Sequence, residues 1–431
     1  MYILALDVGT SSVKAAVLDT ASGALAAALA HVAYDLDHPT PDAAEVPAER
    51  LWSAVAAAAR QATLRAPEVE GIGMSVMAPA LVLLDAADRP CGPIWTHLDR
   101  RSRAAARQTW QTVGEEFLAT VGNRPLPGGI SVIDYRQQLV ADPYLASETK
   151  SYLHLNGWLG LRMTGAKAFD PANASFSGLF NTMTDQTWSP RWCRYFEVDP
   201  AWLPPVLCGT STIGHVRSAV AAELGTPAGI PVKLGTADTS LAMLAAGMGA
   251  GDLLHVVGTT QVLAVLVDRP VAHADRLTRR HGVGAAFVYV AHNPVGGVAL
   301  DWLHQLCFRE QSAEEFFDTT IAAADGRQTR VTLDPPFLGG DRLQIEAHRA
   351  AFRDLEVTTD RMDLLAALLQ AMVRQHRHAL DIIAPGRKFQ RIFLTGGGAD
   401  VMRRLLPEYH TAVSHPFAEG SLHGVSRLFV S

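Results

Sequence analysis

The chain opens with two apolar segments separated by a short polar interruption. Residues 2–8 (YILALDV) and 13–19 (VKAAVLD) are apolar and favour strands, and GTSS at 9–12 lies between them. Glycine accepts positive φ in a tight turn, so the pattern predicts a β-hairpin rather than a strand that enters a helix. An alanine-rich helix is predicted over 47–66, and strands are predicted within 69–77 and 80–95. This alternation of strands and helices favours an α/β fold.

The opening pattern occurs a second time. VGTSSVKAAVLD at 8–19 and VGTTQVLAVLVD at 257–268 agree at six of twelve positions. Each copy is predicted to form a strand, a Gly-Thr turn and a second strand, so the repeat indicates two related α/β domains. Glycine and proline concentrate at 225–237, which favours a junction there.

The two Gly-Thr turns have a chemical interpretation beyond chain reversal. Backbone N–H groups in such a turn form an anion-binding nest, and nearby hydroxyl groups add donors without charge, which suits the phosphates of a nucleotide. The alternative is that Gly-Thr is only a good hairpin turn, but the duplicated arrangement favours the phosphate interpretation. The hydroxyl groups belong to Thr10, Ser11, Ser12, Thr259 and Thr260.

Two further features suit a nucleotide site. Asp7 precedes the first turn, whereas Val256 occupies the matching place before the second, so a Mg²⁺ ion beside the phosphates is one partner for this carboxylate. The alternative is that Asp7 caps its own turn.

A strand also runs into Gly396, Gly397 and Gly398, and glycines without side chains let an adenosine approach the backbone. The chain contains no GxxxxGK[ST] loop, which excludes a P-loop enzyme.

Asp238 is the candidate for activating an acceptor hydroxyl. It follows a glycine-containing turn in KLGTADTSLAML at 233–244 and precedes an apolar helical run. Phosphoryl transfer needs a carboxylate that orients a hydroxyl and takes its proton. A helix N-cap is the alternative role for Asp238, and the residues alone do not choose between the two.

Composition narrows the class of protein. The 431 residues carry a formal charge of −6, which argues against a nucleic-acid or anionic-membrane partner. The four cysteines show no metal-ligand spacing and suit a reducing cytosol. No basic segment precedes the first apolar run and no apolar stretch is long enough to span a membrane, so neither a signal peptide nor a membrane span is predicted. A cytoplasmic enzyme is therefore expected. His376 and His378 are two residues apart on a predicted helix, and both are expected at the surface.

Five segments, taken in order, resemble the FGGY family of carbohydrate kinases, with a xylulokinase-like character: LALDVGTSSVKAAVLD, GTADTSLAMLAAGMGAGDLLHVVGTTQVL, GGVALDWL, PPFLGGDR and LTGGGAD. The resemblance implies two actin-like, ribonuclease-H-like domains with a nucleotide and substrate cleft between them. Residues 1–234 would carry most of the sugar site and 235–431 most of the ATP site. The implied reaction transfers the γ-phosphate of Mg-ATP to a small sugar (ketose) or polyol.

The resemblance also implies a role for each matching residue. Asp238 is the general base and Asp7 serves the metal, directly or through water. Gly396, Gly397 and Gly398 line the adenosine site. The phosphates are held by Gly9, Thr10, Ser11, Ser12, Gly258, Thr259 and Thr260. Family members often dimerise, so a homodimer is compatible with the resemblance, but no stretch identifies an interface.

The segments that would bind the sugar depart from the family pattern. Where a Ser-Gly-Gln-Met-His-Gly stretch is common, this chain has MSVMAPA, with Val76, Ala78 and Pro79 in place of polar groups or glycine. The Trp-x-Asp-x-Arg pattern is echoed by IWTHLDRRS with altered spacing. We expect Met77, Trp95, Asp99 and Asp238 to contact the substrate, with a changed ligand. Two alternatives are a non-catalytic sugar or nucleotide sensor and an actin-like ATPase that uses no acceptor.

Overall fold

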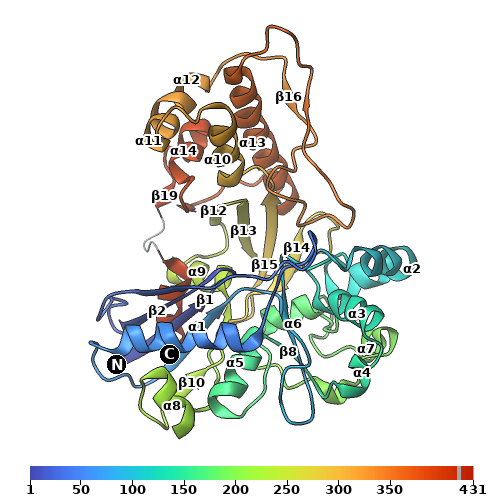
Figure 1. Cartoon of the computed structure of the whole chain (residues 1–431), viewed down its shortest axis with the longest axis vertical. Helices are drawn as coiled ribbons and strands as arrows, with labels where there is room; N and C mark the ends of the chain where they lie inside the picture. The colour runs from blue at the N-terminus through green and yellow to red at the C-terminus, as the bar shows by residue number, and fades with distance from the viewer. Residues whose placement is uncertain (415–418, 431) are drawn as a thin grey trace.

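Two β-sheets, one from each half of the chain, form the framework of the computed structural model (Figure 1). The structure describes residues 1–414 and 419–430, so residues 415–418 and 431 of the predicted second domain lie outside it. In the first sheet the order is β3-β2-β1-β5-β10-β9, and β11 also pairs with β5. These strands are β1 (Tyr2–Val8), β2 (Ser12–Asp19), β3 (Ala30–Ala33), β5 (Ile72–Val76), β9 (Thr212–His215), β10 (Pro231–Lys233) and β11 (Thr236–Ala237).

The second sheet repeats the arrangement of the first. Its order is β14-β15-β13-β12-β18-β19. Strands β12 and β13 form an antiparallel hairpin and β18 runs parallel to β12, just as β1 and β2 form a hairpin and β5 runs parallel to β1. Both predicted hairpins are therefore confirmed. The strands are β12 (Leu253–Val257), β13 (Gln261–Val267), β14 (Leu277–Arg280), β15 (Phe287–Asn293), β18 (Ile392–Thr395) and β19 (Val413–Ser414).

Helices and small strand groups surround these sheets. The first half contains α1 (Ala48–Thr63), α2 (Arg103–Val121), α3 (Ser131–Ala141), α4 (Leu145–Glu148), α5 (Leu155–Thr164), α6 (Pro171–Ser177), α7 (Pro190–Phe196) and α8 (Ser218–Leu224). It also has a sheet of β4 (Glu45–Val46), β6 (Ala80–Leu84), β7 (Ile94–Thr96) and β8 (Ser151–His154). The second half contains α9 (Asp238–Ala245), α10 (Gly297–Cys307), α11 (Ala313–Glu315), α12 (Ile321–Ala324), α13 (Arg361–Ile383), α14 (Ala399–Leu405), α15 (Gly420–Gly424), β16 (Thr332–Leu333) and β17 (Phe352–Arg353). None of the helices described is both long and apolar enough to cross a membrane.

The two faces of β1 pack against opposite ends of the chain. Leu4 and Leu6 face the large core that includes α1, whereas Ile3 and Ala5 face a smaller core with Leu422 of α15. Helix α15 lies beside α9, and Figure 1 places both ends of the chain in the half that holds β1. The last residues described therefore pack on one face of the first sheet, although the sequence places them in the second half.

One prediction about the surface is wrong. His376 on α13 is buried, and its ring stacks on His255 of β12 with 5.0 Å between centroids and lies 5.2 Å from the ring of Tyr409. Neither ring nitrogen of His376 has a hydrogen-bond partner among the described residues. Burial, and the neighbouring His255, lower the pKa of His376 to about 3. His378 is exposed, as expected.

Replacing His376 tests this buried cluster. The unfolded chain protonates the imidazole near its ordinary pKa of 6.5, whereas the folded chain does so only near 3, so unfolding takes up a proton between these values. The free energy of unfolding should fall by about 2 kcal/mol per such imidazole between pH 7 and pH 5. We expect His376→Phe to reduce this loss in urea titrations, while His378→Phe at the exposed position leaves it unchanged. Equal pH dependence in both variants would contradict the assignment.

Candidate active site

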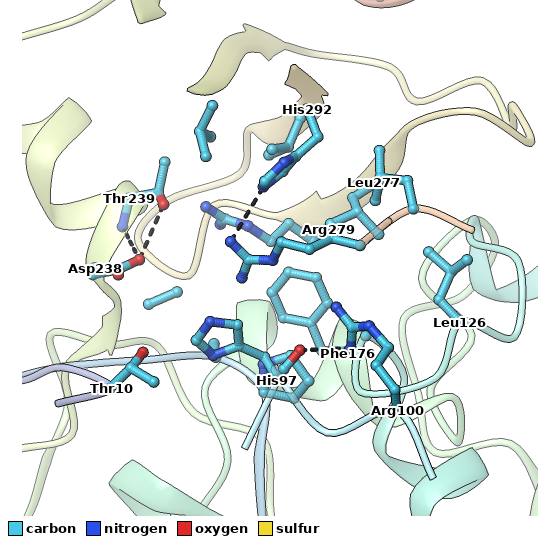
Figure 2. Close-up of a pocket in the computed structure, with 18 residues that line it drawn as sticks. Thr10, His97, Arg100, Leu126, Phe176, Asp238, Thr239, Leu277, Arg279 and His292 are labelled. Atoms are coloured by element: carbon cyan, nitrogen blue, oxygen red, sulfur yellow. Dashed lines mark hydrogen bonds between the residues drawn. The ribbon is translucent and has the colours of Figure 1, made fainter. Parts of the chain in front are cut away.

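A cavity of about 290 Å³ is lined by residues of both halves of the chain (Figure 2). The apolar part of the lining comes from both halves: Ala78, Pro79 and Phe176 belong to the first half, and Leu277 and Val290 to the second. Among the described residues that line it, Asp238 is the single carboxylate. The other polar or charged side chains in the wall are Thr10, His97, Arg100, Thr239, Arg279, His292 and Arg342.

Asp238 stands at the first turn of α9, directly after β11. Its Oδ1 accepts hydrogen bonds from the backbone N–H of Thr239 at 2.5 Å and from the Thr239 hydroxyl at 3.0 Å. Ala237 is the N-cap residue, so Asp238 is the first residue of the helix rather than its cap. The side chain is exposed to the cavity, as a proton acceptor for a bound hydroxyl must be.

A buried carboxylate fixes the segment that leads to Asp238. Asp170 is the N-cap of α6, and its oxygens accept hydrogen bonds from the Thr236 hydroxyl at 2.6 Å and from the amides of Asn156 at 2.9 Å and Asn173 at 2.6 Å. Burial raises the pKa of Asp170, although these donors act in the opposite direction. Because Thr236 is two residues before Asp238, Asp170 positions the proposed base.

The first Gly-Thr turn joins β1 to β2 beside this segment. The Gly9 N–H donates to the Ser12 carbonyl at 3.0 Å, and the Tyr34 hydroxyl donates to the Gly9 carbonyl. Asp7 precedes the turn and receives a hydrogen bond on Oδ2 from the Ser421 hydroxyl at 2.8 Å, while its Oδ1 is buried without a partner among the described residues. Burial, together with the charge of Asp238, raises the pKa of Asp7 to about 6.

The second turn is held by the start of α10. The Gly258 N–H donates to the Thr260 carbonyl at 3.0 Å, and the Gly297 N–H of α10 donates to the Gly258 carbonyl at 2.9 Å. A side chain at Gly296 would overlap the backbone of Thr259 and Thr260, so glycine lets the helix approach the turn. Gly296 and Gly297 therefore help to position the second Gly-Thr turn. We did not predict this role from the sequence, although a pair of adjacent glycines often marks a close approach of two backbone segments.

The glycine cluster joins β18 to α14 beside the second turn. The Gly398 N–H donates to the Val257 carbonyl at 3.0 Å, so the cluster contacts the residue that precedes Gly258. Gly396 has φ +97°, and a Cβ there would clash with the Val257 carbonyl. The position of a Cβ at Gly397 is open space. The structure thus brings the cluster and the second turn together, as a shared nucleotide site requires.

The predicted substrate contacts are placed less directly. Met77 is buried, and its neighbours Ala78 and Pro79 line the cavity. Trp95 lies under the guanidinium of Arg101, 3.6 Å from its ring centroid, and the Asp99 carboxylate accepts hydrogen bonds from the same arginine. Neither Trp95 nor Asp99 is among the lining residues. Their contact with substrate stays a prediction.

Five cationic or imidazole side chains in the wall were not predicted from the sequence. They come from separate segments, after β7, on β14, on β15 and in the loop between β16 and β17, so no hydropathy pattern or spacing unites them. The motif PPFLGGDR contains one of them, yet the sequence alone does not show where its side chain points. The five are His97, Arg100, Arg279, His292 and Arg342.

The duplicated sheets and the cavity lined by both halves are typical of an actin-like, two-domain α/β fold. Two family models match this chain: the N-terminal domain of the FGGY family of carbohydrate kinases at residues 2–245 and the C-terminal domain of the same family at residues 253–406. The chain belongs to this family and is a carbohydrate kinase.

Individual relatives agree with this assignment. The chain is 23% identical over 405 residues to the putative sugar kinase YoaC of Bacillus subtilis. This match covers 92% of this chain and 81% of the relative. It is 25% identical over 297 residues to an autoinducer-2 kinase of Yersinia enterocolitica, covering 64% of this chain and 54% of the relative. The chain thus spans about half the length of that second kinase.

Solved structures confirm the fold. A ligand-bound xylulose kinase from Lactobacillus acidophilus matches with a TM-score of 0.90 at 19% identity, over 99% of this chain and 88% of the other. A xylulose kinase from Rhodospirillum rubrum matches with a TM-score of 0.85 at 24% identity, over 100% and 89%. A Plasmodium falciparum glycerol kinase with ADP matches with a TM-score of 0.83 at 16% identity, over 99% and 88%.

The glycine cluster offers a matched pair of substitutions. Gly396→Ala places a Cβ against Val257 at a positive φ, so we expect a loss of about 1–3 kcal/mol in the free energy of unfolding and weaker nucleotide binding. Gly397→Ala adds the same methyl group in open space and should leave the stability unchanged. Thermal denaturation and ATP titration of both variants measure the difference. Equal stability of the two would contradict the close approach.

Proposed function

We propose that this kinase transfers the γ-phosphate of ATP to a hydroxyl of a small polyhydroxylated acceptor, a ketose or a polyol in the first instance, with Asp238 as the general base. The observation that carries the proposal is the position of Asp238: it is the single carboxylate among the described lining residues, and it faces a cavity lined by both halves. Thr10 of the first Gly-Thr turn lines the same cavity, so a phosphate at this turn lies near the proposed base.

The placement of ATP is supported by three glycine-containing segments. The turns at 9–12 and 258–260 occupy equivalent places in the two sheets, and their backbone N–H groups and hydroxyls suit phosphate oxygens. The cluster at Gly396, Gly397 and Gly398 adjoins the second turn through Val257 and leaves room for the adenosine. The triphosphate would then run from the second half toward Asp238.

The residues present fit a Mg²⁺ ion at Asp7. Mg²⁺ is commonly held by one or two carboxylates together with substrate phosphates and water, and the buried Oδ1 of Asp7 lacks a partner among the described residues. Ser421, whose hydroxyl donates to Oδ2 of this carboxylate, would orient it. The ion would supply neutralisation of charge on the β- and γ-phosphates.

In the proposed reaction the Asp238 carboxylate accepts the proton of the acceptor hydroxyl while that oxygen bonds to the γ-phosphorus. The bond between the γ-phosphorus and the bridging oxygen of ADP breaks, and ADP leaves with the electron pair. The Thr239 N–H and hydroxyl hold Oδ1 of Asp238, which leaves Oδ2 for the substrate. Closure of the two halves over the bound ligands would exclude water that otherwise competes for the phosphoryl group.

Asp238→Asn tests the assignment of the base. Asparagine keeps the size of the side chain but cannot take the proton, so kcat for acceptor-dependent ADP release should fall by about 10²- to 10⁴-fold. Binding of ATP should change little. Asp301→Asn, which removes an exposed carboxylate of α10 outside the cavity, should keep normal turnover.

The assay uses Mg-ATP with a panel of pentuloses, hexuloses, heptuloses, pentitols and glycerol. Acceptor-stimulated ADP release that is lost in Asp238→Asn would support the proposal. Near-normal turnover in Asp238→Asn would overturn the base assignment. ADP release that no acceptor stimulates would point to an ATPase, and ligand-induced thermal stabilisation without any product would point to a sensor.

Asp7→Asn tests the metal site. Removing one formal charge from the proposed Mg²⁺ ligand should raise the Mg²⁺ concentration for half-maximal activity at saturating ATP by about tenfold or more. The measurement is a Mg²⁺ titration of wild type, Asp7→Asn and Asp301→Asn. An unchanged Mg²⁺ requirement in Asp7→Asn would remove Asp7 from the metal site.

A further inference from the structure

The cavity beside Asp238 holds two arginines that form no close ion pair with the residues described. Arg279 is 1% exposed, and burial lowers the pKa of Arg279 and of Arg342 to about 10, so both guanidinium groups are charged at neutral pH. Within residues 1–414 and 419–430, neither forms an ion pair with a carboxylate within 4.0 Å. A buried cation without a close counter-ion is costly, so the site suits a ligand that supplies the charge.

The partners of the two arginines are neutral. Arg279 donates through Nη1 to the Ser240 hydroxyl at 2.5 Å and to the Arg280 carbonyl at 3.1 Å, and Nη1 of Arg342 lies 3.2 Å from Nε2 of His292. A guanidinium has five N–H donors, so these bonds use only part of each group.

Arg100 in the same wall has a different environment. Its Nη1 donates to three backbone carbonyls, at distances of 2.8 to 3.0 Å, and its Nε lies 3.7 Å from the Asp341 carboxylate. Arg103 forms a shorter pair with the same carboxylate, at 2.9 Å. Arg100 is therefore engaged by the protein, which leaves Arg279 and Arg342 as the groups available to a ligand.

The wall is richer in donors than a neutral sugar requires. Each hydroxyl of a polyol offers a proton as well as lone pairs, so a neutral-sugar site needs acceptors. The charged acceptor here is Asp238 alone, and the loop at Val76, Ala78 and Pro79 adds no polar side chain. Burial and neighbouring arginines hold the pKa of His97 and His292 well below the usual range, so these rings add no further charge.

The charged ends of the two arginines lie at different places in the cavity. Figure 2 shows Asp238 and Thr10 on one side and Arg100 and Leu126 on the other, with the Arg279 side chain crossing the middle. The proposed phosphate-binding turn lies at the Asp238 side, where its backbone N–H groups and hydroxyls would serve the phosphates. The guanidinium of Arg279 reaches α9, because its Nη1 donates to Ser240, two residues after Asp238, whereas Nη1 of Arg342 lies beside His292 of β15. An acceptor whose hydroxyl faces Asp238 would therefore meet the charged ends of both arginines.

We propose that the acceptor is a polyhydroxylated carboxylic acid whose carboxylate is bound by Arg279 and Arg342 while a hydroxyl elsewhere on its carbon chain faces Asp238. The inference rests on the proposed kinase function and specifies its substrate class. Asp238 and Asp170 act on Arg279, and Asp238 acts on Arg342, only from beyond ion-pair distance, so among the described residues neither guanidinium has a carboxylate in direct contact, and a ligand carboxylate would supply one. Arginine suits this role because its planar fork binds a carboxylate through two parallel hydrogen bonds.

The test compares acceptors that differ only in charge. Coupled ADP release with Mg-ATP is measured for pentonates and hexonates beside the pentitols and hexitols of the same configuration, the corresponding ketoses, and sugar monophosphates. We expect one acid to exceed its matched alditol by at least about 10²-fold in kcat/KM. A ketose or alditol that exceeds every acid would overturn the inference while leaving the kinase proposal intact. A preference for a sugar monophosphate would replace the carboxylate by a phosphate and overturn the stated class.

Variants of the arginines test the contact itself. Arg342→Gln should raise KM for the acid by at least tenfold with less than a threefold change in KM for ATP, and Arg342→Lys should recover part of the loss. Arg279→Gln should do the same. Arg280→Gln is the matched control, because Arg280 is the next residue on β14, is not among the lining residues and bonds to Gln186 and Gly284 instead.

Two further results separate the possible failures. If Arg342→Gln raises KM for ATP and not for the acid, the arginines serve the γ-phosphate, and the inference is wrong. If no acceptor, acidic or neutral, stimulates ADP release, the proposed kinase function fails together with the inference. Thermal stabilisation by the acid alone, lost in Arg342→Gln and kept in Arg280→Gln, gives a readout that does not depend on turnover or on the fold of Arg279→Gln.

Discussion

The buried carboxylate of Asp170 is the contact on which the geometry of the site depends. It caps α6 in the first half and accepts the hydroxyl of Thr236 at the junction between the halves. Gly282, which follows β14 in the second half, packs so closely against Thr236 and Asp170 that a Cβ there would overlap them. One side chain therefore joins a helix start, the junction and the second half. Because a buried carboxylate needs several donors, these elements have little freedom to shift independently.

The junction also explains how a duplicated fold yields one site. Each half has its own hairpin and parallel neighbour, and the two turns differ mainly in what precedes them, Asp7 in one and Val256 in the other. The chain then crosses back, so that Leu422 and Val425 pack on the first sheet beside Leu241 of α9. Helix α9, which presents Asp238, is thus held by the first half although it belongs to the sequence of the second. This crossing keeps the proposed base aligned with the first turn.

The sequence predicted the fold well because the fold is encoded locally. Both hairpins, α1 and the strands around 69–95 follow from periodicity and turn residues, and the repeat indicated the duplication. The candidate site was predictable only where it follows the chain, as at Asp238 and the glycine turns. Arg279 and Arg342 lie more than sixty residues apart in sequence, and their convergence is a property of tertiary structure. His376 shows the same limit, since α13 buries a residue that its neighbours Arg377 and His378 suggest is exposed.

The charged residues of the cavity would couple binding of the acceptor to closure of the two halves around it. The first half contributes Arg100, which the protein already engages, whereas the second contributes Arg279 and Arg342, which have only neutral close partners. An anionic acceptor would therefore gain most of its electrostatic contacts from the half that also carries the proposed adenosine site. Such contacts form fully only when both halves surround the ligand, and this is also the state in which water is excluded from the phosphoryl group. Binding energy from the acceptor would thereby stabilise the arrangement in which transfer takes place, which is how contacts remote from the reacting atoms contribute to the rate.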